Sequence, residues 1–392
     1  MKNIVIIGST GSIGTSAIEV VKEFPDKFRI IGLSAKTQLE KLRVQGETFR
    51  VPFLAVETKE SAVWLRSQLS YPAEILVGDE GLVELAQLKE GDVVLIGIAG
   101  IKGLIPAYYA LKAGKRVALA NKESIVSAGE LLKEIAREHG GEIIPVDSEH
   151  SALFQLLRCD EKKYVKKLIL TASGGPFLTW DPKDFDKITP DLALKHPTWQ
   201  MGPRITIDSA TLINKGLEII EAKILFDFPL EAIEVIIHPQ SVVHSLVELE
   251  DGTILAHLSL PDMRLPISYA LNYPERNTLS LNTLDLTAIG SLNFQKVDWE
   301  KFPCLRLAYE VARLGPPYPL ILEASDEALV EAFLERKISF REISYYIEKT
   351  LNEFKFFTKP EKDLNSYLTL HQEVKTFTKQ LIEREKLCGF TS

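Results

Sequence analysis

The stretch that decides the fold is NIVIIGSTGSIG, residues 3–14. Residues 4–7 are all β-branched, which is typical of a strand buried on both faces of a parallel sheet. Gly8, Gly11 and Gly14 follow at three-residue spacing, and residues 15–24 then have the pattern of a helix. Such glycines let the backbone approach a pyrophosphate, which the helix N-terminus binds. The spacing is a variant of the usual glycine fingerprint, and its place between strand and helix predicts a dinucleotide-binding domain.

Strands and helices continue to alternate beyond this turn, and the expected strands are 28–34, 53–56, 75–78, 93–97, 116–120 and 143–146. This alternation predicts an α/β protein with an N-terminal Rossmann-like doubly wound sheet. Ligands of such sheets bind beyond the carboxyl ends of the strands. The segment Asn121-Lys122-Glu123 falls at one of these ends, so we expect it to face the cofactor, although an ordinary polar loop is the alternative.

The end of the second strand favours NADPH over NADH. An NAD-specific enzyme usually places Asp or Glu there for the ribose 2′-hydroxyl. This chain has Ser34-Ala35-Lys36-Thr37, with no acid before Glu40, and small and basic residues suit a 2′-phosphate. A solvated lysine at a helix start is the alternative interpretation of Lys36.

Two carboxylates, Asp147 and Glu149, follow the apolar run 143–146. Side chains two apart on a strand point the same way, and paired carboxylate oxygens suit Mg²⁺ or Mn²⁺. The alternative is a helix start, in which Asp147 or Ser148 caps the segment 151–157.

The sequence pattern changes after these carboxylates. A strand over 168–172 ends at Ser173, and a long polar segment with His196 and Trp199 runs to residue 203. Because a solvated loop seldom carries tryptophan, we expect a lid, while His196 is equally compatible with a surface position.

Within the next segment, residues 205–221, we expect Asp208 or Ser209 to cap a helix whose buried side carries Leu212, Ile213, Leu217, Ile220 and Ile224. Asn214 and Glu218 are four apart and share one face, with Lys215 beside them. Lys215, Asn214 and a serine near the helix start could clamp a phosphate, and Glu218 could supply a third carboxylate. The alternative is that Asn214 and Glu218 simply form a surface pair.

The remaining segments complete the organisation. Strands over 235–238, 241–247 and 253–258 predict a second sheet, whose edge could pair with another subunit. Residues 273–303 have the composition of a linker, and helical periodicity beyond it predicts a small bundle.

Composition bounds the function. A length of 392 residues predicts two or three domains, and the net charge of −8 argues against nucleic acid or anionic membranes as partners. Three scattered cysteines, no apolar run of membrane-spanning length and no signal segment predict a cytoplasmic enzyme.

Together the motifs closely resemble those of the 1-deoxy-D-xylulose 5-phosphate reductoisomerase family, along essentially the whole chain. They are GSTGSIG at 8–14, ANKES at 120–124, VDSEHSA at 146–152, TASGGPF at 171–177, HPTWQMG at 196–202, TIDSATLINKGLE at 206–218, HPQSVVHS at 238–245 and LPDMR at 260–264.

The resemblance implies the following roles. Asp147, Glu149 and Glu218 would hold a divalent cation, Mg²⁺, Mn²⁺ or Co²⁺. The substrate, a sugar phosphate, would contact Lys122, Ser148, Glu149, Ser173, His196, Trp199, Ser209, Asn214, Lys215 and Glu218. NADPH would contact Thr10, Gly11, Ser12, Ile13, Ala35, Lys36, Thr37, Asn121, Glu123 and Gly202. Ala35 and Thr37 depart from the Gly and Asn that family members commonly carry there.

The implied domains are an NADPH-binding domain at 1–146, a catalytic domain at 147–272 with its lid at 173–203, the linker at 273–303 and a helical domain at 304–392. A homodimer is also implied. Two rival functions stay open from the residues alone. One is a metal-free NADP-dependent aldehyde dehydrogenase, which would need a nucleophilic cysteine; the other is an NADP-sensing protein whose carboxylates only cap helices.

Overall fold

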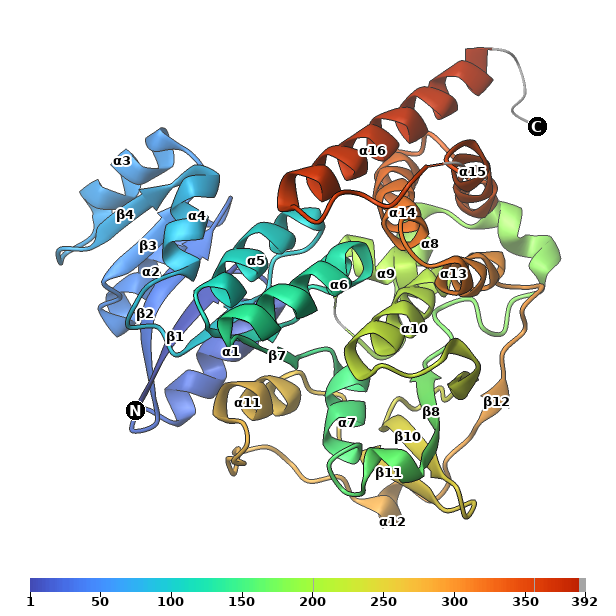
Figure 1. The fold of residues 1–392 in the computed structure, drawn as a ribbon, viewed down its shortest axis with the longest axis horizontal. Helices are drawn as coiled ribbons and strands as arrows, with labels where there is room; N and C mark the ends of the chain where they lie inside the picture. The colour runs from blue at the N-terminus through green and yellow to red at the C-terminus, as the bar shows by residue number, and fades with distance from the viewer. Residues whose placement is uncertain (200, 356, 388–392) are drawn as a thin grey trace. The chain divides into compact units, whose positions relative to one another are not determined.

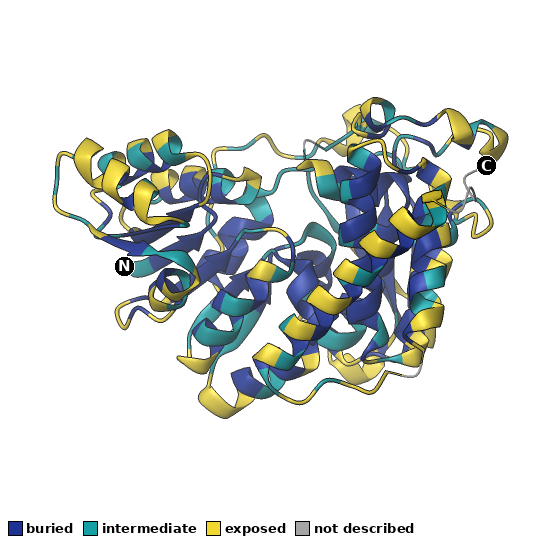
Figure 2. Cartoon of the chain, turned by 90° about the horizontal axis from the view of Figure 1, so that it is seen from above, coloured by how far each residue is buried: buried dark blue, intermediate teal, exposed yellow. Residues whose placement is uncertain are grey.

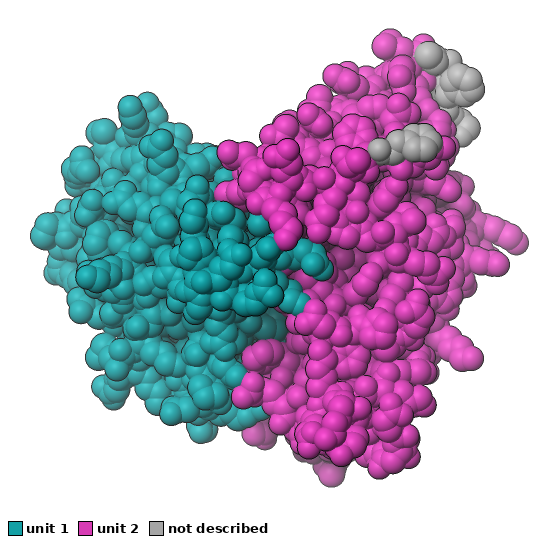
Figure 3. Space-filling model, viewed as in Figure 1, with its two compact units in different colours: residues 1–124, 130–151, 262–282 teal, residues 125–129, 152–261, 283–392 magenta. Residues whose placement is uncertain are grey.

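The structure is a computed structural model that describes residues 1–199, 201–355 and 357–387. The chain forms two compact units (Figure 3). Unit 1 comprises residues 1–124, 130–151 and 262–282, and unit 2 comprises residues 125–129, 152–261 and those from 283 onward. Gln200 of the HPTWQMG motif and residues 388–392 of the predicted helical domain lie outside the described residues.

A seven-stranded parallel sheet forms the centre of unit 1 and confirms the predicted doubly wound fold (Figure 1). Its order is β4-β3-β2-β1-β5-β6-β7. The chain order reverses beside β1, which lies between β2 and β5, and ligands of such sheets bind at this point. The strands are β1 (Lys2–Ile7), β2 (Phe28–Ala35), β3 (Phe53–Val56), β4 (Glu74–Val77), β5 (Val93–Ile96), β6 (Arg116–Leu119) and β7 (Glu142–Pro145).

Helices cover this sheet and bury its strands, which are dark blue in Figure 2. Residues Ile4 to Ile7 of β1 are fully buried, as their β-branched sequence predicts. The helical elements of unit 1 are α1 (Ser12–Glu23), α2 (Leu39–Phe49), α3 (Lys59–Gln68), α4 (Gly78–Ala86), η1 (Ile101–Gly103), α5 (Leu104–Lys112), α6 (Lys122–His139), α7 (Ser148–Leu156) and α11 (Arg264–Asn272). Residues 125–129 of α6 and the residues of α7 from 152 onward are assigned to unit 2.

The helix α11 belongs to unit 1 although it follows most of unit 2 in the sequence. It packs against α1 and β6 (Figure 1). At its end, Lys2 Nζ donates to the backbone oxygens of Leu271, Asn272 and Tyr273 at 3.3, 3.0 and 3.3 Å. The first strand and the last helix of unit 1 are therefore joined directly.

Unit 2 contains the predicted second sheet, in the order β11-β10-β8-β9-β12. The strands β8 and β9 pair in parallel, and the other neighbours pair antiparallel. The strand β12 lies within the segment 273–303 that we expected to be a linker. The strands are β8 (Val165–Ala172), β9 (Ile233–Ile237), β10 (Val243–Leu249), β11 (Ile254–Leu258) and β12 (Gln295–Lys296).

The helices of unit 2 pack on one large apolar core. They include the C-terminal helices that sequence periodicity predicted. The elements are η2 (Lys162–Tyr164), η3 (Pro182–Lys187), α8 (Pro190–Ala193), α9 (Pro203–Ala210), α10 (Ile213–Phe226), η4 (Leu230–Ala232), α12 (Leu286–Ile289), α13 (Pro303–Leu314), α14 (Tyr318–Leu334), α15 (Phe340–Glu353) and α16 (Leu364–Leu387). Among the described residues, no helix is long and apolar enough to cross a membrane.

Two local predictions were wrong. Asp208 and Ser209 do not cap a helix, because both lie inside α9. The helix α9 ends at Ala210, and Leu212, which has a φ of 59°, precedes α10. The segment after Ser173 is also less loop-like than its polar composition indicated, since it forms η3 and α8 and buries Phe177, Phe185 and Ile188 in the core.

Candidate cofactor and metal sites

The turn between β1 and α1 has the geometry of an anion site. Gly11 is the N-cap of α1, Ser12 and Ile13 begin the helix, and no acidic residue lies in its first turn. A Cβ atom at Gly14 would lie 2.3 Å from the Gly8 oxygen, so only glycine fits there. Gly8 itself has a φ of 85°. The backbone can therefore approach a dinucleotide pyrophosphate, and the predicted residues 10–13 lie together at this point.

Two side chains of α2 hold the turn in place, and sequence reasoning missed both. Ser9 Oγ donates to Gln45 Oε1 at 2.7 Å, while Gln45 Nε2 donates to the Ser9 oxygen at 3.0 Å. Lys41 Nζ donates to the Thr10 oxygen at 2.8 Å. A buried glutamine between Leu42 and Gly46 on the inner side of α2 is the sequence signal that could have indicated this support.

Ala35 is the last residue of β2, and Lys36 and Thr37 follow it at the carboxyl edge of the sheet. Lys36 Nζ lies 2.9 Å from Glu57 Oε1, in the residue that follows β3. The Lys36 hydrogen bond, despite slight desolvation, lowers the pKa of the Glu57 carboxyl. Lys36 is therefore held near the edge where the adenosine ribose of a dinucleotide lies.

Asn121 and Glu123 brace the loop that follows β5. Asn121 is the N-cap of α6, and its Oδ1 accepts from the Ser124 amide at 3.0 Å. Its Nδ2 donates to the oxygens of Ile98 and Gly100 at 3.0 and 2.9 Å. Glu123 Oε1 accepts from the Gly100 amide at 3.0 Å. Both predicted residues thus fix the backbone beside the glycine turn.

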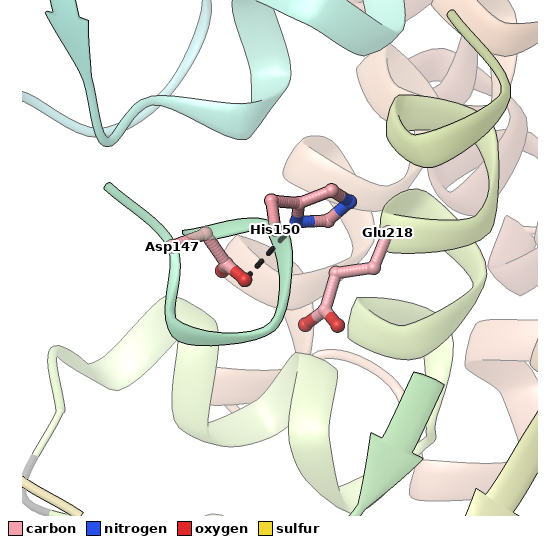
Figure 4. A group of neighbouring side chains, drawn as sticks. All are labelled: Asp147, His150 and Glu218. Atoms are coloured by element: carbon pink, nitrogen blue, oxygen red, sulfur yellow. Dashed lines mark hydrogen bonds and ion pairs between the residues drawn. The ribbon is translucent and has the colours of Figure 1, made fainter. Parts of the chain in front are cut away.

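The Asp147 turn joins β7 to α7 and serves as a helix start. Asp147 Oδ1 accepts from the Glu149 amide at 3.2 Å and lies 3.1 Å from His150 Nδ1 (Figure 4). Lys122 Nζ lies 3.0 Å from Asp147 Oδ2. Ser148 Oγ donates to Glu149 Oε2. The capping interpretation of Asp147 is therefore correct, and both acids lie just beyond the carboxyl end of β7.

His150 is a second residue that sequence reasoning missed. Its side chain is fully buried, and it contacts Asp147 from one helical turn away. The i,i+3 spacing from Asp147 in the VDSEHSA motif is the signal that could have indicated it.

In unit 2, α10 carries Glu218 with its two predicted neighbours (Figure 4 shows Glu218 on this helix). Asn214 Nδ2 donates to Glu218 Oε1 at 2.6 Å, and Lys215 Nζ pairs with Glu218 Oε2. Glu218 and Lys215 are 1% and 4% exposed. The prediction that these residues share one helix face is confirmed.

Ser173, the first residue of the predicted lid, contacts His196 in its later part. His196 Nε2 lies 3.1 Å from Ser173 Oγ. His196 Nδ1 accepts from the amides of Thr198 and Trp199 at 3.1 and 2.9 Å. Desolvation by burial lowers the pKa of His196. Trp199 lies beside His244, with ring centroids 6.4 Å apart, and Gly202 is the N-cap of α9, where Ser209 is buried.

A buried ionic network lies elsewhere in unit 2 and was not predicted. Arg204 of α9 pairs with Glu323 Oε1 at 2.6 Å and Glu327 Oε2 at 3.3 Å, both on α14. His371 Nε2 of α16 lies 2.7 Å from Glu323 Oε2. Burial alone would raise the pKa of Glu323, but His371 and Arg204 lower it to about 2. Lys375 pairs with Glu327 Oε1 at 2.6 Å, so cationic side chains already bind these carboxylates.

A glycine-rich turn at the switch point of a doubly wound sheet, with carboxylates at the carboxyl end of the edge strand β7, is typical of an α/β oxidoreductase of the dinucleotide-binding class. Family models for 1-deoxy-D-xylulose 5-phosphate reductoisomerase match residues 4–129, and those for its C-terminal domains match residues 143–226 and 258–377. The chain belongs to the 1-deoxy-D-xylulose 5-phosphate reductoisomerase family.

Individual relatives agree with this assignment. The 1-deoxy-D-xylulose 5-phosphate reductoisomerase of Thermodesulfovibrio yellowstonii is 50% identical over 91% of this chain and 93% of its own length. That of Caldanaerobacter subterraneus is 48% identical over 93% and 95%. A crystal structure of DOX-P reductoisomerase in complex with NADPH, fosmidomycin and magnesium has a TM-score of 0.93 at 39% identity, covering 98% of this chain and 99% of that one. The Zymomonas mobilis enzyme in complex with NADPH has a TM-score of 0.91 at 38% identity, covering 97% and 99%.

Proposed function

We propose that this chain converts 1-deoxy-D-xylulose 5-phosphate to 2-C-methyl-D-erythritol 4-phosphate in the non-mevalonate route to isoprenoid precursors. The reaction is an isomerisation that needs a divalent cation, followed by reduction with NADPH. The observation that carries the proposal is the family match, which reaches 50% identity over 91% of the chain.

The NADPH contacts in this proposal are those of the turn and the strand ends in unit 1, together with Gly202. The first helical turn of α1 carries no acidic residue, and the backbone passes too close to Gly14 for any side chain there. Both features fit a bound pyrophosphate. The remaining proposed residues are Thr10, Gly11, Ser12, Ile13, Ala35, Lys36, Thr37, Asn121 and Glu123. NADPH supplies the hydride when it is bound.

The cation ligands in this proposal are Asp147, Glu149 and Glu218. Each offers carboxylate oxygens, the donors that Mg²⁺, Mn²⁺ and Co²⁺ accept, and none of the three is a thiolate or an amine. A divalent cation, when bound, withdraws electron density from the substrate oxygens and makes a hydroxyl easier to deprotonate. Asp147 also caps α7, which fixes its carboxylate for this task.

The substrate contacts divide between its phosphate and its reacting end. Ser173, Ser209, Asn214 and Lys215 would donate hydrogen bonds to the phosphate oxygens. His196 donates from Nε2 to Ser173 Oγ, because its Nδ1 accepts two amides, and Ser173 can then donate its own hydrogen to the phosphate. Lys122 and Ser148 would orient the oxygens of the reacting end, and Trp199 would exclude water above it.

The two rival functions are less well supported. An aldehyde dehydrogenase needs an activated thiol. Of the two cysteines among the described residues, Cys304 has a pKa that burial raises well above its usual range, and Cys159 is exposed with its Sγ 3.5 Å from the Gln155 oxygen. A sensor would bind NADPH without consuming it. Loss of NADPH absorbance with the sugar phosphate, abolished by EDTA, would separate the proposed enzyme from both.

The sharpest test of the cation site is Glu218→Gln, which keeps the shape and removes the charge. We expect turnover with Mg²⁺ or Mn²⁺ to fall by about a thousandfold or more, since transition-state charge is no longer neutralised. NADPH affinity should change less than about twofold. Glu310→Gln, an exposed isosteric change on α13, is the matched control. Unchanged turnover in Glu218→Gln would remove this residue from the site.

We also propose a homodimer in the cytoplasm. The strand β11 is the edge of the second sheet, and Ile254 on it is 54% exposed, so a second copy could extend the sheet there. The cytoplasmic setting is supported by the composition, which includes only three scattered cysteines.

A further inference from the structure

Two lysines from different loops of unit 1 converge on one carboxylate oxygen at the carboxyl edge of the sheet. Lys36 Nζ lies 2.9 Å from Glu57 Oε1, and Lys102 Nζ lies 3.4 Å from the same atom. Glu57 is 36% exposed, and the lysines are 63% and 55% exposed. Like charges repel, and the Glu57 carboxylate offsets the repulsion between the two ammonium groups.

The backbone accounts for this convergence. The strands β2 and β3 pair in parallel with Ala35 opposite Val56, so the residues that follow, Lys36 and Glu57, leave the sheet side by side. Lys102 comes from η1, after β5 on the other side of β1. Its side chain therefore reaches across the carboxyl ends of β1 and β2 to meet Glu57.

The position of Lys102 is fixed from behind. Asn121 Nδ2 donates to the Gly100 oxygen, and Glu123 Oε1 accepts from the Gly100 amide, two residues before Lys102. Gly103 packs so closely on Asn121 that a Cβ there would lie 2.5 Å from the Asn121 side chain. The loop that presents Lys102 is thus braced rather than loose.

We propose that Lys102 is a second ligand for the 2′-phosphate of NADPH, acting with Lys36, and that Glu57 competes with this phosphate for both lysines. The inference rests on the proposed NADPH-dependent function and names a specificity residue for it. A phosphate monoester carries about −1.5 to −2 charges and three acceptor oxygens, so it satisfies two ammonium groups better than one carboxylate oxygen does.

The proposal makes predictions of opposite sign for neighbouring residues. The probes are adenosine 2′,5′-bisphosphate and 5′-AMP, which differ by the 2′-phosphate, and the measurement is isothermal titration calorimetry on the full chain. Lys102→Gln should weaken the bisphosphate by about three- to tenfold and 5′-AMP by less than about twofold. Glu57→Gln should tighten the bisphosphate by about two- to fivefold, because the competing carboxylate is removed.

The control is Lys112→Gln, an exposed lysine on α5 that lies over the Tyr108 ring. It removes the same positive charge far from the proposed contact, so it measures how much the net charge of the protein alone changes nucleotide affinity. Equal weakening of both probes in Lys102→Gln, or a weaker bisphosphate in Glu57→Gln, would overturn the proposal. If the wild-type chain itself does not distinguish the two probes, the proposed NADPH preference fails instead, and the two failures are therefore distinguishable.

Discussion

The imidazole of His196 has a defined protonation state because of its hydrogen bonds. Two backbone amides donate to Nδ1, so this atom carries no hydrogen, and Nε2 donates to Ser173 Oγ. Desolvation by burial lowers the pKa of the ring in the folded chain. A proton on Nδ1 would break the hydrogen bonds that both backbone amides donate to this atom. The neutral ring therefore holds the segment from Thr198 to Trp199 against Ser173.

The pH dependence follows from this state. The unfolded ring keeps a pKa near 6.5, and the folded ring has a lower one. Its contribution to stability is therefore complete above pH 6.5 and is lost as the pH falls through the folded pKa. We expect His196→Gln to lower the Tm by roughly 2–4 °C at pH 7.5, and by much less at pH 5.5. A Tm difference that stays constant or widens on acidification would contradict the neutral ring.

Single residues show where sequence reasoning stops. From the sequence, His196 was compatible with a surface position, because nothing in the sequence indicates the two backbone amides that donate to its ring. Asp147 was ambiguous for another reason: a cap and a metal ligand need the same carboxylate at the same place. The hydrogen bond to the Glu149 amide shows the cap, and the ligand role stays a proposal.

At the scale of elements, the strands of unit 1 were predictable and the helices around α9 were not. A β-branched run such as residues 4–7, followed directly by a glycine turn, strongly favours a buried strand. The break between α9 and α10 falls on Leu212 in a left-handed conformation, where glycine or asparagine is the usual signal. Its burial in the core stabilises this conformation, and a single-sequence pattern does not show that packing.

The ionic network that joins α9 to α14 allows a stability prediction. Arg204→Met would remove the guanidinium that pairs with Glu323, a carboxylate that is 0% exposed and would keep His371 as a neighbour. Removing one partner of a buried pair costs about 3–5 kcal/mol, because the other charge stays buried. We expect Arg204→Met to unfold at a lower urea concentration than the wild-type chain, as measured by far-ultraviolet circular dichroism.

The control for this prediction is Arg306→Met on α13. Arg306 pairs with Glu310 at 2.9 Å, but the two side chains are 47% and 52% exposed. Its loss should cost less than about 1 kcal/mol. Equal midpoints for the two variants would mean that burial of the Arg204 network adds nothing to stability.

For the whole molecule, the proposed dimer gives the clearest test. Ile254→Lys places a charge on the exposed edge strand β11, where pairing with a second copy would bury it. We expect a shift from dimer to monomer in light scattering after gel filtration, with the dissociation constant raised at least about tenfold. Leu286→Lys changes another exposed apolar residue, 56% exposed on α12, and should leave the mass unchanged. A monomeric wild-type chain would contradict the proposal directly.

The place of α11 in unit 1 has a consequence for the order in which the chain folds. All seven strands of the sheet have been synthesised by residue 145, but the helix that packs on α1 and β6 ends at Asn272. The hydrogen bonds of Lys2 to this helix end span about 270 residues of sequence. The N-terminal unit on a translating ribosome therefore keeps one apolar face uncovered until residues 152–261 of unit 2 have emerged. The first unit to begin folding is thus completed only after much of the second has been made.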